Sequence, residues 1–286
     1  MPGTVPGTAP ETLLEGLTFA EGPRWRQDRL WFSDFYNHRV VAVDLAGHAE
    51  TMLTVPQVPS GLGWLPDGTM LVVSMNDRKL MRVQDGALVV HGDLSAIAGG
   101  PCNDMVVDEK GRAYVGNFGY DRFNGEAVRA ANLARVDPDG TVSVVAEDMR
   151  FPNGSVITPD GKTLIVAETM GSRLTRFTIA GDGALSGRSV FAEMEGVFPD
   201  GICLDAEGAI WVADARGNRV LRVREGGTIA ETIPLPGRNA FACMLGDADR
   251  RTLFLCTAPA SGPDRAGKTD GKIETVRVTV PGAGLP

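Results

Sequence analysis

Short apolar runs alternate with turns along the whole chain, and residues 198–214 show this pattern most clearly. Residues 201–204 are apolar, residues 205–208 form a turn that ends in glycine, and residues 210–213 are apolar again. Two short apolar runs around a glycine turn predict a β-hairpin. Asp200 precedes the first strand and Asp214 ends the second. Because hairpin strands are antiparallel, both carboxylates are expected at the same face of the fold.

The same two-strand unit recurs along the chain at intervals of 39 to 50 residues. Each copy continues into a turn and two further strand-like runs, as in residues 39–44 and 50–54. Four strands in a repeat of about forty to fifty residues are typical of propeller blades. We therefore predict an all-β fold: a six-bladed β-propeller with four-stranded antiparallel blades around a central channel. The copies begin at Glu21, Ser60, Asn103, Asn153, Asp200 and, in degenerate form, Ala242.

The ends of the chain and one long repeat complete the expected domain plan. Residues 1–15 are rich in proline, glycine and threonine and predict an N-terminal arm, whereas residues 16–286 predict a single propeller domain. Residues 11–19 are expected to pair beside strands at 273–280 and so close the last blade. An insertion at 118–131 lengthens the third repeat and should overhang the polar face, either as a lid or as a plain surface loop.

The composition and charge of the chain indicate which kinds of binding partner to expect. A net charge of -8 and a pI near 5.0 argue against a nucleic-acid surface. No apolar run could span a bilayer, and the start of the chain does not resemble a signal peptide. The four cysteines form no Cys-x-x-Cys pair, which favours buried free thiols in a reducing compartment. We expect a cytoplasmic protein, a monomer or weak homo-oligomer, with no nucleic-acid or membrane partner.

Polar residues recur at the two ends of each predicted hairpin. One Asn or Asp before glycine is usually only a turn residue, but recurrence at one register in every blade favours a function. In a propeller the first strand of each blade lies beside the channel, so the first residues of these strands should form an inner ring and the ends of the second strands an outer ring. The expected inner ring is Glu21, Ser60, Asn103, Asn153, Asp200 and Ala242, and the outer ring is Asp34, Ser74, Asn117, Glu168, Asp214 and Thr257.

The inner ring offers two carboxylates and two amides, all of them oxygen donors. Buried acids need partners, and a divalent cation would neutralise Glu21 and Asp200. Such donors favour calcium, magnesium or manganese. His38, His48 and His91 fall on neither ring, so a His/Cys zinc cage is not indicated. The alternative is a cation that only plugs the channel.

The ordered motifs resemble the senescence-marker-protein/gluconolactonase/luciferin-regenerating-enzyme family from about Glu21 to Ala258. That resemblance implies a six-bladed propeller with a divalent metal at the channel mouth and hydrolysis of lactones. It also implies the metal ligands Glu21, Asn153 and Asp200, with Asn103 as a fourth ligand or a substrate contact. The motifs that carry it are Ala20-Glu21-Gly22-Pro23, Trp31-Phe32-Ser33-Asp34, Cys102-Asn103-Asp104, Pro152-Asn153-Gly154 and Pro199-Asp200-Gly201.

One position departs from the sugar-lactonase members of that family, which commonly carry an arginine two residues before the third-blade asparagine. Here the residue is Pro101, which cannot donate a hydrogen bond. The substrate is therefore expected to be a small-molecule lactone or ester that is less polar than gluconolactone.

We predict a metal-dependent lactonase in which Asp200 is both a metal ligand and the general base. Asn103 and Asn117 would orient the substrate, and Glu168 and Asp214 would support the ligands from behind. Calcium is the first expected cation, with magnesium, manganese, zinc or iron as alternatives. Two other functions stay open: an aryl-ester or phosphotriester hydrolase on the same site, and a non-catalytic ligand-binding propeller with a structural metal.

Overall fold

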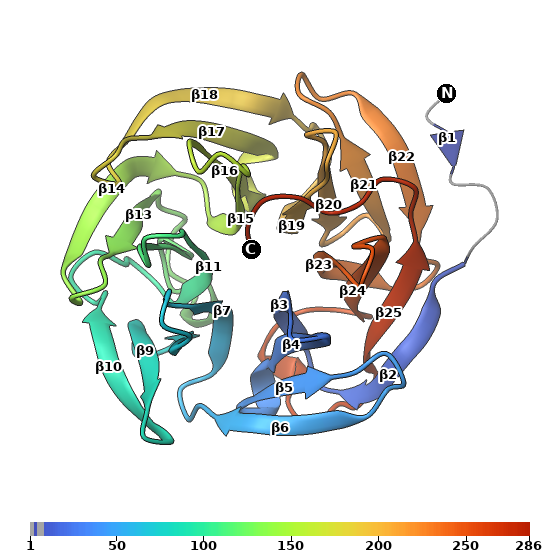
Figure 1. The fold of residues 1–286 in the computed structure, drawn as a ribbon, viewed down its shortest axis with the longest axis horizontal. Helices are drawn as coiled ribbons and strands as arrows, with labels where there is room; N and C mark the ends of the chain where they lie inside the picture. The colour runs from blue at the N-terminus through green and yellow to red at the C-terminus, as the bar shows by residue number, and fades with distance from the viewer. Residues whose placement is uncertain (1–2, 5–8) are drawn as a thin grey trace.

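Six small sheets surround a central axis in the computed structural model, which describes residues 3–4 and 9–286 (Figure 1). In every blade the first strand lies innermost and its neighbours follow outward. The six-bladed, all-β prediction is confirmed. From the inside outward, the blades are β3 (Ala20–Arg26), β4 (Arg29–Asp34), β5 (Arg39–Val43) and β6 (Ala49–Thr54); β7 (Pro59–Trp64), β8 (Met70–Ser74), β9 (Lys79–Gln84) and β10 (Ala87–Asp93); β11 (Cys102–Val107), β12 (Ala113–Asn117), β13 (Ala131–Val136) and β14 (Val142–Met149); β15 (Pro152–Ile157), β16 (Thr163–Glu168), β17 (Arg173–Ile179) and β18 (Leu185–Glu193); β19 (Pro199–Leu204), β20 (Ile210–Asp214), β21 (Arg219–Val223) and β22 (Ile229–Pro234); and β23 (Asn239–Gly246), β24 (Thr252–Ala258), β25 (Gly271–Arg277) and β2 (Glu11–Leu17).

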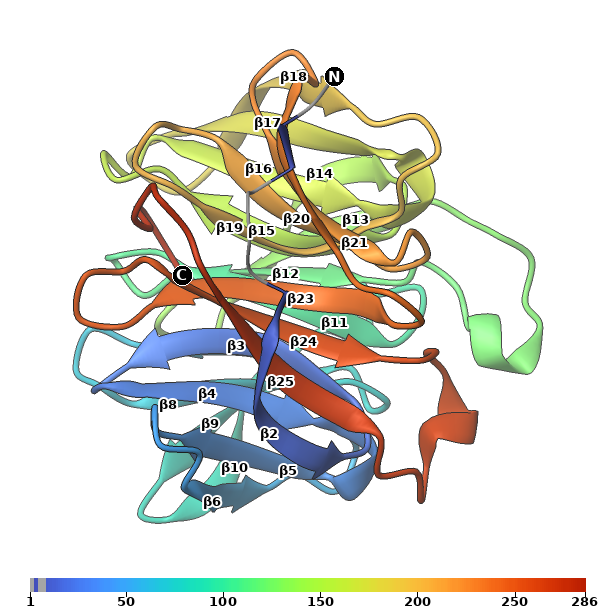
Figure 2. The same ribbon diagram turned by 90° about the vertical axis from the view of Figure 1, so that its right-hand side faces the viewer.

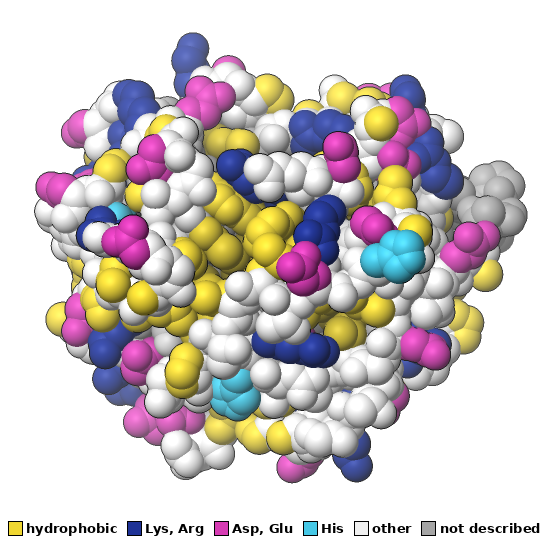
Figure 3. All heavy atoms as spheres, turned by 60° about the horizontal axis from the view of Figure 1, so that its bottom comes forward, with side chains coloured by type: hydrophobic (Ala, Val, Ile, Leu, Met, Phe, Trp, Pro, Cys, Tyr) yellow, Lys and Arg dark blue, Asp and Glu magenta, His cyan; other side chains and the backbone are white. Residues whose placement is uncertain are grey.

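Helical structure in the described residues is confined to single turns that follow strands. They are the 3-10 helices η1 (Phe35–Asn37), η2 (Arg122–Asn124), η3 (Thr169–Gly171) and η4 (Pro263–Arg265). No helix among the described residues is long and apolar enough to cross a membrane. Figure 3 shows acidic and basic side chains interspersed over the outside, with hydrophobic side chains gathered in a central hollow.

The inner hairpins form because their apolar runs are joined by turns with strong local signals. In the fifth blade, Asp205 Oδ1 accepts hydrogen bonds from the backbone N–H groups of Glu207 and Ala209, and Gly208 adopts a left-handed φ of 77°. All residues of β19 and β20 are buried. Such continuous burial is expected of strands that other sheets cover on both faces.

The N-terminal segment closes the ring of blades. β2 pairs antiparallel with β25, with Glu11 opposite Thr275 and Leu17 opposite Gly271, so the outer strand of the last blade comes from the start of the chain (Figure 2). This confirms the predicted pairing of residues near 11–19. A short strand β1 (Gly3–Thr4) pairs parallel to β22. Of the predicted arm, residues 1–2 and 5–8 lie outside the described residues, and β2 begins within it.

The hydrophobic cores lie between neighbouring blades. The cluster at the closure joins the first, fifth and last blades through buried side chains such as Phe32, Trp211 and Phe254. Trp25 of the first blade stacks on Phe254 of the last, with ring centroids 5.2 Å apart. Each blade is therefore stabilised mainly by its neighbours, and the closure contributes to the stability of the whole ring.

We expect Leu17→Ala to lower the free energy of unfolding by about 2–5 kcal/mol, because a fully buried leucine in the closing strand is lost. Leu45→Ala, at a side chain 48% exposed, is the control and should change stability by less than about 0.5 kcal/mol. Urea denaturation measures both. Equal effects of the two substitutions would contradict the proposed role of β2.

Candidate active site

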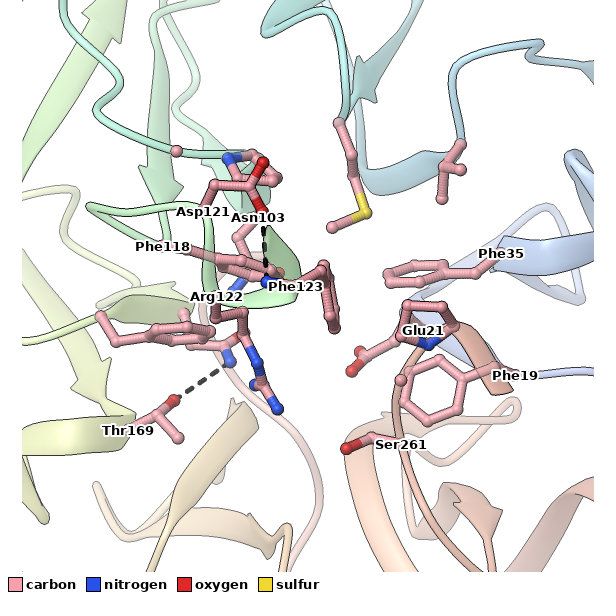
Figure 4. Close-up of a pocket in the computed structure, with 18 of the residues that line it drawn as sticks. Phe19, Glu21, Phe35, Asn103, Phe118, Asp121, Arg122, Phe123, Thr169 and Ser261 are labelled. Atoms are coloured by element: carbon pink, nitrogen blue, oxygen red, sulfur yellow. Dashed lines mark hydrogen bonds between the residues drawn. The ribbon is translucent and has the colours of Figure 1, made fainter. Parts of the chain in front are cut away.

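A cavity of about 760 Å³ opens at one end of the channel, where the inner strands begin and the second strands end. Residues from all six blades line it. Glu21, Asn103, Asn153 and Asp200 lie at its floor, each less than 8% exposed. Figure 4 shows the carboxylate of Glu21 pointing into the cavity between Phe19 and Phe35. Four of the five polar residues predicted for the inner ring are thus brought into one cavity, whereas Ser60, the fifth, does not line it.

The inner ring needs one correction, in the sixth blade. The residue before each ring position pairs with the end of the second strand, as Pro199 does with Asp214. In the last blade the equivalent pair is Ala240 with Thr257, so Phe241 occupies the ring and lines the cavity. Ala242, the predicted member, takes the position that glycine has in the fifth blade. The sixth blade lacks the polar residue before glycine that marks four of the other five copies, which is why the sequence misplaced it by one residue.

The acids of the outer ring form salt bridges with arginines. Asp34, Glu168 and Asp214 are fully buried, and each lies opposite an arginine five residues later, with N–O distances of 2.9–3.0 Å. Such pairs tie the second strand to the third, and no outer-ring residue lines the cavity. The expectation that Glu168 and Asp214 support the ligands is therefore wrong. The partners are Arg39, Arg173 and Arg219.

Asn117 anchors the insertion. Its Nδ2 donates to the carbonyl oxygen of Asn132 at 2.7 Å, and its Oδ1 accepts from the N–H of Gly119 at 2.9 Å. Both ends of the amide are engaged by backbone, and the side chain is not part of the cavity wall. Any effect of Asn117 on a substrate therefore has to pass through the segment that it holds.

Two floor amides differ in how their hydrogen bonds are used. Nδ2 of Asn153 donates to Oδ1 of Asp200 and, at 3.1 Å, to Oγ1 of Thr169. With the nitrogen committed, Oδ1 is the atom of Asn153 that can bind a further partner. Nδ2 of Asn103 is buried without a hydrogen-bond partner. Buried polar atoms in native proteins are normally paired, so an orphan donor on a residue that lines a cavity is consistent with a ligand there.

Burial raises the pKa of both floor acids well above the usual range. For Glu21 the further causes are repulsion from Asp200 and Asp104, and for Asp200 the next cause is Asp104. Asp104 is itself paired with Arg24 at 2.6 Å. One of three neighbouring acids thus has a basic partner, and Glu21 and Asp200 remain as two uncompensated charges when ionised.

The floor fits a divalent cation. Two carboxylates and the amide oxygens of Asn103 and Asn153 are the hard donors that calcium or magnesium prefers. The two negative charges of the ionised carboxylates would balance the two positive charges of one such ion. Among the described residues, no group of three or more His, Cys, Asp or Glu side chains could hold a metal ion. A cation at this floor would therefore depend on the amides as well as on Glu21 and Asp200.

An apolar collar surrounds the cavity above the floor. It consists mainly of side chains two residues before the inner ring and one residue after the outer ring, a signal that was visible in the sequence but not recognised. Stacking stiffens this wall, with the rings of Phe118 and Phe151 4.3 Å apart. The collar is Phe19, Phe35, Val58, Met75, Pro101, Phe118, Phe151 and Phe198.

The insertion overhangs the mouth of the cavity. Its residues Arg122, Phe123 and Asn124 belong to the cavity wall, as do Gly262 and Pro263 of the last blade. Figure 2 shows the insertion, in green, and the η4 loop, in red, projecting from the same face.

The cavity wall also includes His38, a residue that sequence analysis set aside. It follows η1 in a left-handed conformation, and its Nδ1 is buried without a hydrogen-bond partner. It lies off both rings, as expected from its position in the repeat.

Comparison with known proteins points to one family. Residues 19–259 match the SMP-30/Gluconolactonase/LRE-like region. Pentonolactonase XacC of Haloferax volcanii is 29% identical over 87% of this chain and 85% of its own length. The 6-deoxy-6-sulfogluconolactonase of Pseudomonas putida is 28% identical over 93% of both.

Solved structures share the fold. A luciferin-regenerating enzyme superimposes with a TM-score of 0.84 at 18% identity, covering 98% of this chain and 99% of that one. Regucalcin from Agrobacterium tumefaciens, described as a calcium-binding protein, gives 0.82 at 24% identity, covering 97% and 96%.

We expect the metal-stripped protein to lose stability as pH rises from about the ordinary carboxyl pKa values of 3.8 and 4.5 through the raised folded values of Asp200 and Glu21. In that window the folded state holds protons that the unfolded chain has released, so the free energy of unfolding falls with pH. Urea denaturation of chelator-treated protein measures this. The control, Glu21→Gln with Asp200→Asn, should be flatter over the same window. A stripped wild type that matches it would contradict the raised pKa values.

Proposed function

Because the chain belongs to the SMP-30/gluconolactonase/LRE-like family, we propose that it is a metal-dependent hydrolase of lactones less polar than sugar lactones. The observation that carries this proposal is the pair of buried acids, Glu21 and Asp200, which have no basic partner at the floor of an apolar-walled cavity. The named activities of two relatives, a pentonolactonase and a 6-deoxy-6-sulfogluconolactonase, support the reaction class.

Glu21, Asn153 and Asp200 would hold the cation, with Asn103 as a fourth ligand or a substrate contact. Calcium is the first candidate, and magnesium, manganese, zinc or iron are the alternatives. When bound, such an ion polarises a carbonyl and lowers the pKa of water. Its presence would also relieve the repulsion that raises the pKa of Glu21.

Asp200 is the best-placed general base. Its Oδ1 accepts the amide of Asn153, which fixes the carboxylate and leaves Oδ2 to take a proton from the attacking water. Asn103 lines the same cavity and has a buried Nδ2 without a hydrogen-bond partner, which would donate to the carbonyl oxygen as negative charge develops there. Water attack and oxyanion stabilisation thereby come from two different blades.

The collar supports a preference for apolar substrates. Pro101 stands in the cavity wall and offers no side-chain donor, and its counterparts in other blades are Phe19, Val58, Phe151 and Phe198. Sugar hydroxyls facing this wall would lose hydrogen bonds to water without replacement. The aromatic side chains also favour aryl esters as a second class of substrate for the same floor.

Removing the floor carboxylate should abolish turnover without unfolding the protein. Asp200→Asn is expected to lower kcat by about 10²–10⁴-fold, as for a lost general base, and Asp200→Asn or Glu21→Gln should prevent cation binding. His38→Asn, in the same cavity wall, is the control and should retain kcat within a few-fold. Steady-state kinetics, elemental analysis and circular dichroism measure these outcomes. Wild-type metal content in either floor variant would refute the ligand assignment.

Unsubstituted aliphatic or aromatic lactones should have a higher kcat/KM than gluconolactone. Pro101→Arg restores a donor to the wall and should shift the ratio toward gluconolactone by about tenfold or more, since a site gains discrimination from hydrogen bonds to hydroxyls. Pro66→Arg, at an exposed position outside the cavity, is the control. A gluconolactone rate above that of every unsubstituted lactone tested would contradict the expected preference.

A further inference from the structure

Two arginines line the mouth of the cavity, and neither forms a salt bridge or donates a side-chain hydrogen bond within the described part of the chain. They are Arg122 of the insertion and Arg216, which follows the fifth-blade hairpin. Several other arginines have carboxylate partners, among them Arg39, Arg173 and Arg219. The two cations at the mouth are therefore available to a ligand.

Both guanidinium groups lie against aromatic rings of the collar. Cζ of Arg216 is 4.3 Å from the ring centroid of Phe198, and Cζ of Arg122 is 5.9 Å from that of Phe151. Phe151 and Phe198 occupy the same register in adjacent blades, two residues before the floor residues Asn153 and Asp200. Stacking on a ring face leaves the N–H edge of a guanidinium free to bind an anion in a bidentate manner.

The acids nearest to Arg122 in sequence are already engaged. Asp121 accepts hydrogen bonds from the backbone of Phe123 and Asn124, and Glu126 accepts from Arg129 at 2.7 Å. Figure 4 shows the side chain of Arg122 extending into the cavity.

The positive charge of Arg122 also affects the pKa of Asp200 at the floor of the cavity. Burial and Asp104 raise the pKa of Asp200, and Arg122 acts in the opposite direction. A divalent cation would be balanced by the two carboxylates beneath it, so the charge at the mouth is left for the substrate.

We propose that Arg122 and Arg216 select lactones whose apolar body carries an anionic group, such as a carboxylate. This inference rests on the proposed lactonase function. The lactone would face the floor, the apolar body would fill the collar, and the anion would meet the guanidinium groups. Hydrolysis joins the water oxygen to the carbonyl carbon and breaks the ring C–O bond. One proton goes to the released hydroxyl and one to solvent as the new carboxylate ionises.

The test compares 5-phenyl-oxolan-2-one with its para-carboxylate derivative in the full-length protein. In wild type the carboxylate should have the higher kcat/KM. Arg122→Met and Arg216→Met should each lower the ratio of the two kcat/KM values by about tenfold, mostly through KM of the charged lactone. Arg122→Lys should recover part of the ratio. Arg224→Met removes an exposed arginine outside the cavity wall that forms no salt bridge among the described residues, and it should keep the wild-type ratio.

The outcomes separate this inference from the proposed function. If wild type hydrolyses both lactones and neither methionine variant changes the ratio, the arginine assignment is wrong and the lactonase proposal stands. If neither lactone is hydrolysed, calorimetry with the two corresponding lactams decides. Tighter binding of the carboxylate lactam that is lost in Arg122→Met supports the anion site, and equal binding of both lactams in wild type overturns it. Circular dichroism and thermal midpoints confirm that each variant is folded.

Discussion

The site is governed by one electrostatic constraint: two carboxylates buried together with no basic residue to neutralise them. Glu21 and Asp200 come from blades far apart in sequence, yet each raises the cost of ionising the site. Arg24 forms no salt bridge with either acid, because its guanidinium binds Asp104 and the carbonyl oxygens of Leu62 and Met105. Its charge lowers the pKa of Glu21, but burial and the neighbouring acids raise that pKa by more. A buried charge without a partner is expensive, so the floor must hold either protons or a cation.

The propeller creates that constraint through its own packing. Each inner strand presents one residue to the ring and, next to it, a residue that touches the neighbouring blade. At Gly201 an added Cβ would lie 2.4 Å from Cβ of Ala242, and at Gly154 it would lie 2.6 Å from the backbone nitrogen of Ile202. Only small residues allow this approach, and the closeness of the strands brings the polar ring together. Asp104 is the exception at this position, and Arg24 is the partner that makes its burial tolerable.

Short sequence patterns within each blade explain which ring residues could be predicted. The ring residues Asn153 and Asp200 precede a glycine and stand at a fixed distance from a glycine turn, so the hairpin pattern located them and the six blades together. Phe241 has neither signal, and its position became clear only from strand pairing. The outer acids were assigned to the site because their register was periodic, but the arginine five residues after Asp34, Glu168 and Asp214 was the competing signal. It identified these acids as structural pairs.

The sequence could not show which residues form the mouth of the cavity, because Arg122 lies on an insertion without a repeat pattern. The cavity is acidic at the floor and apolar at the collar, and its mouth carries Arg122 and Arg216 without salt bridges among the described residues, beside the insertion acids Asp121 and Glu126. On the proposed reaction, ring opening creates a new carboxylate beside Glu21 and Asp200. With a single divalent cation these two acids already balance the charge, so the product adds an uncompensated negative charge at the floor. Repulsion there and attraction by Arg122 at the mouth both act outward on the product. The same charge gradient that orients an anionic lactone on entry therefore favours departure of the acid after hydrolysis.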